Sequence, residues 1–318
     1  MYRVLVSATN YSKYCARGKQ YLLENGFQVD ETKNDRPYTQ QELLDMIADY
    51  DAAIVGCDSW GEEVLSKAHK LKAIARFGVG IDNLDLEAAK RHGVHVTYCP
   101  GINSNSVSEH AIMLMLAMER YLPRLNETTR QGMWERVMVH EINACTIGLL
   151  GFGNIARKVA EKLQPFHPAK ILAYDAYPNY EEAERLHVTM CDLETVLSES
   201  DIVSIHVPSI PETHHLICDK TLAQMKPGAY LINTARGPIV DEEAAARALA
   251  SGRLGAMASD VFESDPVRMD NPLLAQKNFI CTPHTAAESY EVYDKVGYMT
   301  AEAVVDILNN RTPVNQLV

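Results

Sequence analysis

The sequence of 318 residues lacks the features that mark several classes of protein. No run approaches the roughly 18 apolar residues of a membrane span, and residues 1–7 do not have the layout of a secretory signal. There is no block of basic residues, and the net charge of −12 would repel nucleic-acid phosphates. We therefore expect a cytoplasmic protein that has neither nucleic acid nor membrane as a partner.

Cysteine is present but not in the spacing of a disulfide framework or a zinc site. The seven cysteines lie tens of residues apart without a C-x-x-C pair, which predicts reduced thiols. The eleven histidines include no H-E-x-x-H motif, so we expect no metal. With 47% hydrophobic and 23% charged residues, the composition is that of an ordinary globular protein, and the length predicts about two domains.

Short β-branched runs alternate with helical periodicity along most of the chain. One series includes the runs at 4–6 and 52–55, and a second begins at 145–150. This alternation is the βαβ pattern of a parallel sheet covered by helices on both faces. We predict two α/β domains with doubly wound sheets of the Rossmann or flavodoxin type. The last helix has no sheet of its own to cover, so residues 1–100 with 286–318 are predicted as one domain and 101–285 as the other.

A glycine motif follows the strand predicted at 147–150. Gly151, Gly153 and Ala156 fit the pattern G-x-G-x-x-A at the start of a predicted helix. The first glycine permits a tight turn, the second lets the backbone approach a pyrophosphate, and the helix N-terminus supplies free N–H groups. Asp175 ends the next predicted strand, 22 residues after Gly153, where a carboxylate would bind the adenosine ribose. Because no arginine stands beside this acid, the motif favours NAD over NADP.

An arginine, several acids and a histidine follow later predicted strands. Arg236 comes after the strand at 229–232, the acids lie within 260–266, and His284 follows the strand at 279–281. The carboxyl ends of parallel strands line the ligand crevice of a doubly wound sheet. There an arginine can bind a substrate carboxylate through two parallel hydrogen bonds, and a histidine can exchange a proton with a hydroxyl. These are the groups needed to oxidise a 2-hydroxy acid while hydride leaves for nicotinamide.

The chain resembles the D-isomer-specific 2-hydroxyacid dehydrogenases, and within them most closely the short-form phosphoglycerate dehydrogenases. The resemblance covers nearly the whole chain and implies an active site in the cleft between two α/β domains, NAD as cofactor, a small 2-hydroxy or 2-oxo acid as substrate, and a homodimer. The matching segments are 76–83, 103–110, the glycine motif with Asp175, 206–208, 233–241, 260–266 and 282–284.

The resemblance also implies roles for individual residues. His284 would be the proton donor, and Arg236 would anchor the substrate. Further substrate-binding residues would be Arg76, Val79, Gly80 and Asn103. The residues implied at the NAD site are Gly151, Gly153, Asn154, Ile155, Asp175, His206, Val207, Pro208, Thr213, Thr234, Ala235 and Asp260.

The sequence departs from the family pattern at the catalytic acid. The family usually has Glu five residues after the aspartate that Asp260 matches, and here that position is Asp265. Glu263 is a rival, two positions away. We predict Asp265 as the partner of His284, because it occupies the position of the family's acid and is followed by a proline that can hold the turn.

A second departure concerns the substrate. Phosphoglycerate-specific members use several basic residues for the substrate phosphate; Arg76 is retained, but the loop 56–60 has no basic residue and contains an acid. Phosphoglycerate therefore stands beside lactate, hydroxypyruvate, glyoxylate and bulkier 2-oxo acids as a candidate. A different class of function, a non-catalytic dinucleotide-sensing or corepressor protein, is possible on the same fold. The presence of Arg236, a carboxylate and His284 argues against it.

Overall fold

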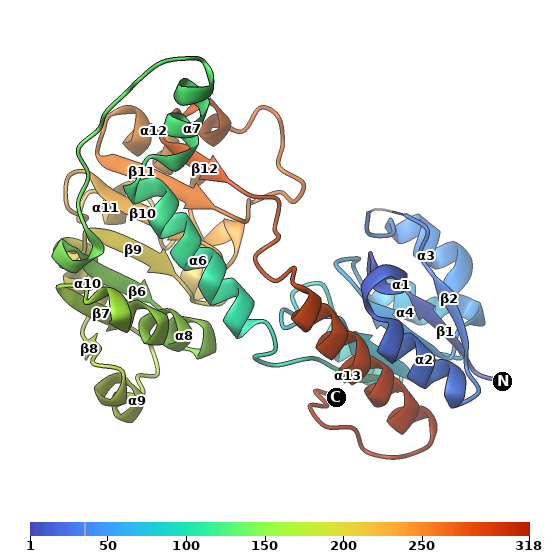
Figure 1. Ribbon diagram of the computed structural model, residues 1–318. Helices are drawn as coiled ribbons and strands as arrows, with labels where there is room; N and C mark the ends of the chain where they lie inside the picture. The colour runs from blue at the N-terminus through green and yellow to red at the C-terminus, as the bar shows by residue number, and fades with distance from the viewer. Residues whose placement is uncertain (35) are drawn as a thin grey trace. The chain divides into compact units, whose positions relative to one another are not determined.

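The computed structural model describes residues 1–34 and 36–318, which form two compact units. Unit 1 comprises Met1–Asn103 and Glu288–Val318, and unit 2 comprises Ser104–Ala287. The predicted boundaries, after residues 100 and 285, lie within three residues of these. Each unit is built around its own parallel sheet (Figure 1). Within the described residues, no helix is long and apolar enough to cross a membrane.

The sheet of unit 1 has five parallel strands in the order β2-β1-β3-β4-β5. Val4 and Val6 pack with residues of α2 and α13 on one face, whereas Leu5 packs with residues of α3 and α4 on the other. The strands are β1 (Arg3–Val6), β2 (Gln28–Glu31), β3 (Ala52–Val55), β4 (Ala73–Arg76) and β5 (His95–Thr97). The helices are α1 (Tyr11–Tyr14), α2 (Ala16–Glu24), α3 (Gln40–Met46), α4 (Glu62–Lys67), α5 (Leu86–Arg91) and α13 (Tyr290–Leu308).

The last helix, α13, belongs to unit 1. It packs against α2 (Figure 1). The two helices approach so closely that a Cβ on Gly18 would lie 2.2 Å from the carbonyl oxygen of Gly297. Glycine on both helices therefore allows the C-terminal segment to complete the core of the unit that the N-terminus begins.

The sheet of unit 2 has seven parallel strands in the order β12-β11-β10-β9-β6-β7-β8. One face packs with residues of α6, α8 and α9, and the other with residues of α10, α11 and α12. The strands are β6 (Thr146–Leu150), β7 (Lys170–Tyr174), β8 (Thr189–Met190), β9 (Ile202–Ile205), β10 (Ala229–Asn233), β11 (Leu254–Ser259) and β12 (Phe279–Cys281). The helices are α6 (Ser104–Glu119), α7 (Leu122–Arg130), α8 (Asn154–Leu163), α9 (Tyr180–Arg185), α10 (Leu193–Glu199), α11 (Asp219–Leu222) and α12 (Glu242–Ala250).

Both sheets are doubly wound, which confirms the predicted fold class. In unit 1 the chain runs outward from β1 in one direction and from β3 in the other, and in unit 2 it does the same from β6 and β9. Ligands of such sheets bind beyond the carboxyl ends of the strands at this reversal. The loops after β6, β9 and β10 are therefore where a dinucleotide site is expected in unit 2.

Candidate active site

The turn after β6 is shaped for a dinucleotide. Gly151 has φ +96°, and a Cβ there would lie 2.8 Å from the carbonyl carbon of His206, so only glycine fits. Gly153 caps the N-terminus of α8, and in the described part of the chain no heavy atom outside its immediate neighbours lies within 4 Å of where its Cβ would be. Asn154 and Ile155 form the first turn of that helix. The open backbone and the helix N-terminus together suit a pyrophosphate.

Asp175 follows β7 and is fixed beside this turn. Its Oδ2 accepts a hydrogen bond from the N–H of Phe152 at 2.6 Å, and its Oδ1 accepts one from the N–H of Tyr177 at 2.8 Å. Each carboxylate oxygen keeps a lone pair for a further donor, such as a ribose hydroxyl. The carboxylate therefore lies beside the glycine turn, and its contact with a ribose stays a prediction.

Two buried polar atoms lie at the ends of the neighbouring strands β9 and β10. Nε2 of His206 and Oγ1 of Thr234 are buried and have no hydrogen-bond partner among the described residues. Burial lowers the pKa of His206 to about 4, so its ring is neutral at physiological pH. Unpaired buried polar groups are costly in a protein interior, and their position at the dinucleotide crevice fits polar groups of a bound NAD.

The remaining residues predicted at the NAD site form the loops after the same two strands. After β9, Thr213 donates from Oγ1 to the carbonyl of Pro208 at 2.6 Å and accepts from the N–H of Ile210, so it closes the loop that contains Val207. After β10, the N–H of Ala235 donates to the side chain of the preceding Asn233 at 3.0 Å. Thr213 therefore shapes its loop through its own hydroxyl, and its contact with NAD stays a prediction.

Asp260, also predicted at the NAD site, anchors the loop that carries His284. Its buried carboxylate accepts from Oγ1 of Thr282 at 2.5 Å and from the N–H groups of Thr285 and Ala286, each at 2.9 Å. Its carbonyl oxygen accepts from the N–H of His284 at 2.8 Å. Sequence reasoning missed this role, since only the tertiary structure brings residues 22 to 26 positions away onto one carboxylate.

The structure places Asp265 against His284. Nδ1 of His284 lies 2.8 Å from Oδ2 of Asp265, and Oδ1 of Asp265 accepts from the N–H of Phe262 at 3.2 Å. Glu263 instead pairs with His215, whose Nε2 lies 2.8 Å from its carboxylate. With Nδ1 held by the carboxylate, Nε2 of His284 is the nitrogen left to meet a substrate. The carboxylate orients the imidazole, so the free nitrogen can exchange a proton with a substrate hydroxyl.

Arg236 stands in the loop after β10, next to the loop that leads to Asp265. The side chain of Asn233 donates to the carbonyl of Arg236 at 2.9 Å, and this hydrogen bond fixes the backbone of the loop. A Cβ on Gly237 would lie 1.8 Å from the carbonyl carbon of Phe262, so the two loops pack backbone against backbone. The ends of the adjacent strands β10, β11 and β12 thus bring an arginine, an acid and a histidine to one edge of unit 2.

In unit 1, Arg76 supports the loop predicted to bind the substrate. It is buried, and its guanidinium donates to the carbonyl oxygens of Phe77 at 2.6 Å and Gly80 at 2.8 Å. Within residues 1–34 and 36–318, the N–H groups of Val79 and Gly80 donate to no protein acceptor. They are therefore available as the backbone donors that the family resemblance implies. Oδ1 of Asn103 is buried and has no partner among the described residues.

The acid in the loop 56–60 points into the core of unit 1. The carboxylate of Asp58 is buried and accepts from Oγ of Ser7 at 2.8 Å and from the indole nitrogen of Trp60. Burial raises its pKa above the usual range of an aspartate. This acid therefore supports the loop from within.

Comparison with known proteins agrees with this geometry. Residues 112–286 match the family described as D-isomer specific 2-hydroxyacid dehydrogenase, NAD binding domain. Over 90% of its length, the chain is 38% identical to the D-3-phosphoglycerate dehydrogenase of Archaeoglobus fulgidus and covers 54% of that protein. The chain thus spans about half the length of that relative. It is 37% identical to the glyoxylate reductase of Thermofilum pendens, again over 90% of its length, and covers 86% of that protein.

Solved structures give the same result. The apo-structure of D-lactate dehydrogenase from Escherichia coli matches with a TM-score of 0.86 at 30% identity, and each chain is covered completely. D-lactate dehydrogenase from Aquifex aeolicus, complexed with NAD and lactic acid, matches with a TM-score of 0.86 at 27% identity over 97% of this chain and 96% of that one. Residues 112–286, which match the NAD binding domain of the family, lie within unit 2. The chain belongs to the family of D-isomer specific 2-hydroxyacid dehydrogenases.

Proposed function

We propose that this protein is an NAD-dependent dehydrogenase that interconverts a D-2-hydroxy acid and the corresponding 2-oxo acid. The observation that carries the proposal is the pairing of His284 with Asp265 at 2.8 Å, at the sheet edge that also carries Arg236. Unit 2 supplies these groups together with the open glycine turn and Asp175. A dinucleotide-binding protein without catalysis would need the turn but not the proton-transfer pair.

The chain's own residues account for substrate binding and proton transfer. Bound NAD would accept hydride from the hydroxy acid, or NADH would return it to the oxo acid. Arg236 would bind the substrate carboxylate with its planar fork of donors, and the roles of the N–H groups of Val79 and Gly80 stay predictions. Nε2 of His284 would take the proton of the hydroxyl during oxidation and return it during reduction, while Asp265 would orient the ring through its contact with Nδ1.

We propose that the substrate is a small 2-oxo acid without a phosphate. The guanidinium of Arg76 is engaged by the carbonyl groups of its own loop, and the loop 56–60 offers no basic side chain to a phosphate. The relatives named glyoxylate reductase support this choice, since the chain covers 86% of one and 90% of another but about half of the phosphoglycerate dehydrogenases. Glyoxylate, hydroxypyruvate and pyruvate are the substrates to test first.

NADH oxidation with a panel of 2-oxo acids tests both proposals. We expect turnover with at least one of glyoxylate, hydroxypyruvate and pyruvate, at a kcat/KM more than tenfold above that for 3-phosphohydroxypyruvate. A tenfold difference is about the effect of one charge-assisted hydrogen bond, which the phosphate of 3-phosphohydroxypyruvate would lack in this protein. A preference for the phosphorylated acid would refute the substrate proposal alone. Tight NADH binding without turnover of any acid would favour the dinucleotide sensor. We also expect NADH to be preferred over NADPH, because Asp175 would repel a 2′-phosphate.

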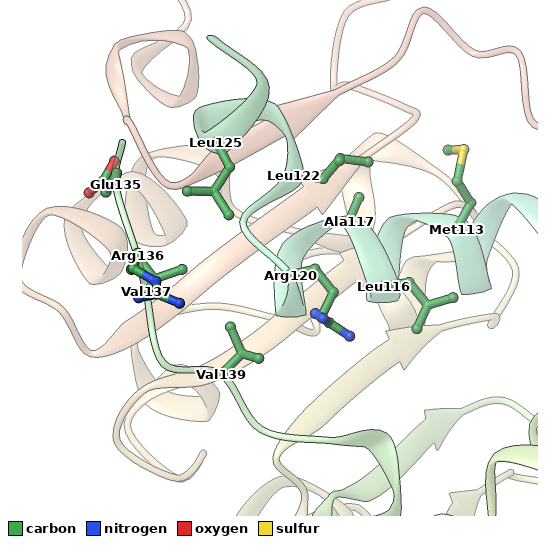
Figure 2. Close-up of a pocket in the computed structure, with 10 residues that line it drawn as sticks. All are labelled: Met113, Leu116, Ala117, Arg120, Leu122, Leu125, Glu135, Arg136, Val137 and Val139. Atoms are coloured by element: carbon green, nitrogen blue, oxygen red, sulfur yellow. The ribbon is translucent and has the colours of Figure 1, made fainter. Parts of the chain in front are cut away.

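We propose that the protein is a homodimer through an apolar face of unit 2. A groove of about 760 Å³ lies between α6, α7 and the segment that follows α7 (Figure 2). Large apolar side chains that line it face solvent: Leu122 is 59% and Met113 47% exposed. We propose a second copy of this chain as the partner at this groove. In a two-fold symmetric dimer the same apolar patch of each copy packs against that of the other, so both are covered. Light scattering should give twice the monomer mass, and Leu122→Glu should shift it to the monomer; a monomeric parent would refute the proposal.

We propose the cytoplasm as the location, as the sequence predicted. The seven cysteines are all free thiols in the structure, which suits a reducing compartment. Fractionation of cells that produce the protein tests this: recovery with membranes or outside the cell would contradict it.

A further inference from the structure

We propose that His110 and Thr282 are positioning residues, which act through the buried carboxylate of Asp260 to hold the loop that presents His284. The inference rests on the proposed function, in which His284 exchanges the substrate's proton. Nothing in the sequence pattern assigned a role to His110 or Thr282, and neither side chain is needed to explain the Rossmann fold or the glycine turn.

The four residues form a chain of contacts in unit 2. His110 lies on α6 with a side chain only 15% exposed, and its Nε2 is 3.0 Å from Oγ1 of Thr282 and 3.6 Å from Oδ1 of Asp260. Oγ1 of Thr282 donates to Oδ1 of Asp260 at 2.5 Å. A hydroxyl has one proton, and here it goes to the carboxylate. The hydroxyl oxygen must then accept from His110, so Nε2 of His110 carries a proton.

The chain of contacts ends on the backbone around His284. Asp260 accepts the N–H groups of Thr285 and Ala286 through its carboxylate and the N–H of His284 through its carbonyl. His284 has φ +55°, a left-handed conformation that is unfavourable for residues other than glycine. Such a conformation persists only where the surroundings determine it. Here His284 and the residues on both sides of it donate hydrogen bonds to Asp260.

The buried carboxylate makes this arrangement dependent on His110. Asp260 is 1% exposed, and a buried carboxylate needs donors directed at it. His110 supplies one N–H directly to Oγ1 of Thr282, which keeps the hydroxyl proton pointing to Asp260. Without His110 the hydroxyl is free to rotate, and without the hydroxyl the carboxylate loses its shortest contact.

A shift of the loop would affect catalysis through the contact between His284 and Asp265. If the loop 282–286 shifts, Nδ1 of His284 moves away from the carboxylate of Asp265, which lies 2.8 Å from it. Reduction of the oxo acid needs the protonated ring and should then fade at a lower pH than in the parent. A residue that only supports folding would lower the stability or the active fraction, and would leave the midpoint of the pH–rate profile unchanged.

Paired variants test the proposal. Thr282→Val removes the hydroxyl at nearly constant side-chain shape, whereas Thr282→Ser keeps the hydroxyl. His110→Phe removes the N–H donor, whereas His110→Gln keeps an N–H donor at about the position of Nε2. We expect Thr282→Val and His110→Phe to lower kcat about tenfold, as for the loss of one hydrogen bond, with little change in the KM for NADH. In both variants the alkaline limb of the reduction profile should move to lower pH. Thr282→Ser and His110→Gln should stay within about threefold of the parent.

Hydrogen exchange gives a readout that does not need turnover. The amides of Thr285 and Ala286 should exchange faster in Thr282→Val and His110→Phe than in the parent and in the two conservative variants. The double variant should be no slower in kcat than the worse single variant, because both changes break one chain of contacts. Parent-like pH profiles and exchange in folded Thr282→Val would overturn the proposal. If the parent itself reduces no 2-oxo acid, the proposed function fails, and exchange still tests whether His110 and Thr282 hold the loop.

Discussion

The buried ring of His206 should make the stability of the protein fall as the pH is lowered below neutral. Its Nε2 has no partner among the described residues, and burial lowers the pKa of the ring to about 4. In the unfolded chain a histidine has a pKa of about 6.5. Between these two values the unfolded chain binds a proton that the folded protein does not, so protonation favours unfolding.

The size of the effect follows from the two pKa values. Above about pH 7 both states are neutral at this ring, and the contribution to stability is constant. From pH 7 to pH 5 the free energy of unfolding should fall by about 2 kcal/mol, and the loss should level off below about pH 4, where both states are protonated. His206→Phe keeps a planar ring and removes the titration, so the variant should lose about 2 kcal/mol less than the parent over the same range.

Urea unfolding of the protein without cofactor, followed by far-ultraviolet circular dichroism at pH 7 and pH 5, measures these differences. His69→Phe is the matched control, because His69 is exposed and its replacement should leave the pH dependence as in the parent. Equal losses of free energy in the parent and in His206→Phe would show that the ring is protonated in the folded protein at pH 5. The reasoning from burial would then be wrong.

Three further variants test the candidate site. Gly153→Ala should raise the KM for NADH roughly tenfold or more, since a methyl group would enter the space left for the pyrophosphate. Gly61→Ala is the control, because Gly61 is also a helix N-cap with open space around the position of a Cβ. It measures the loss of stability caused by alanine at an N-cap, which is up to about 1 kcal/mol. Arg236→Lys should lower kcat/KM by roughly a hundredfold, because an ammonium cannot make the two parallel bonds to a carboxylate, and near-normal kinetics would remove it from the substrate site. Asp265→Asn should make reduction fade at a lower pH and let oxidation persist to lower pH, whereas Glu263→Gln should leave both profiles unchanged; the reverse result would assign the acid to Glu263.

The dinucleotide half of the site could be predicted because its parts are adjacent in sequence. Strand, glycine turn and helix follow one another from 146 to 163, and Asp175 directly follows the next strand. Local backbone requirements, such as the φ of +96° at Gly151, restrict the residue type directly. The alternation of strands and helices likewise determined the doubly wound fold, since each element shows its buried face in its own periodicity.

Two of the edge strands, β2 and β8, were not predicted, because few of their residues are buried and their apolar pattern is weak. β2 has the sequence Gln28–Glu31 with partly exposed residues at the edge of its sheet, and β8 has only two residues. Neither carries an apolar alternation, and each is defined by pairing with a neighbouring strand. Pairing is a tertiary contact that no single segment contains.

Side-chain partners in loops were decided only by the tertiary structure. The sequence by itself determined that an arginine, an acid and a histidine follow successive strands, and position relative to the family's acid favoured Asp265. Whether Asp265 or Glu263 contacts His284 depends on the path of the loop that carries both acids. The contact of Asp265 with His284 joins residues 19 positions apart. Loops have no periodicity from which the direction of a side chain can be predicted. The contact between His110 and Thr282 spans 172 residues in the sequence. It exists because α6 packs against β10 and β11 in the folded domain, which brings His110 near the loop after β12.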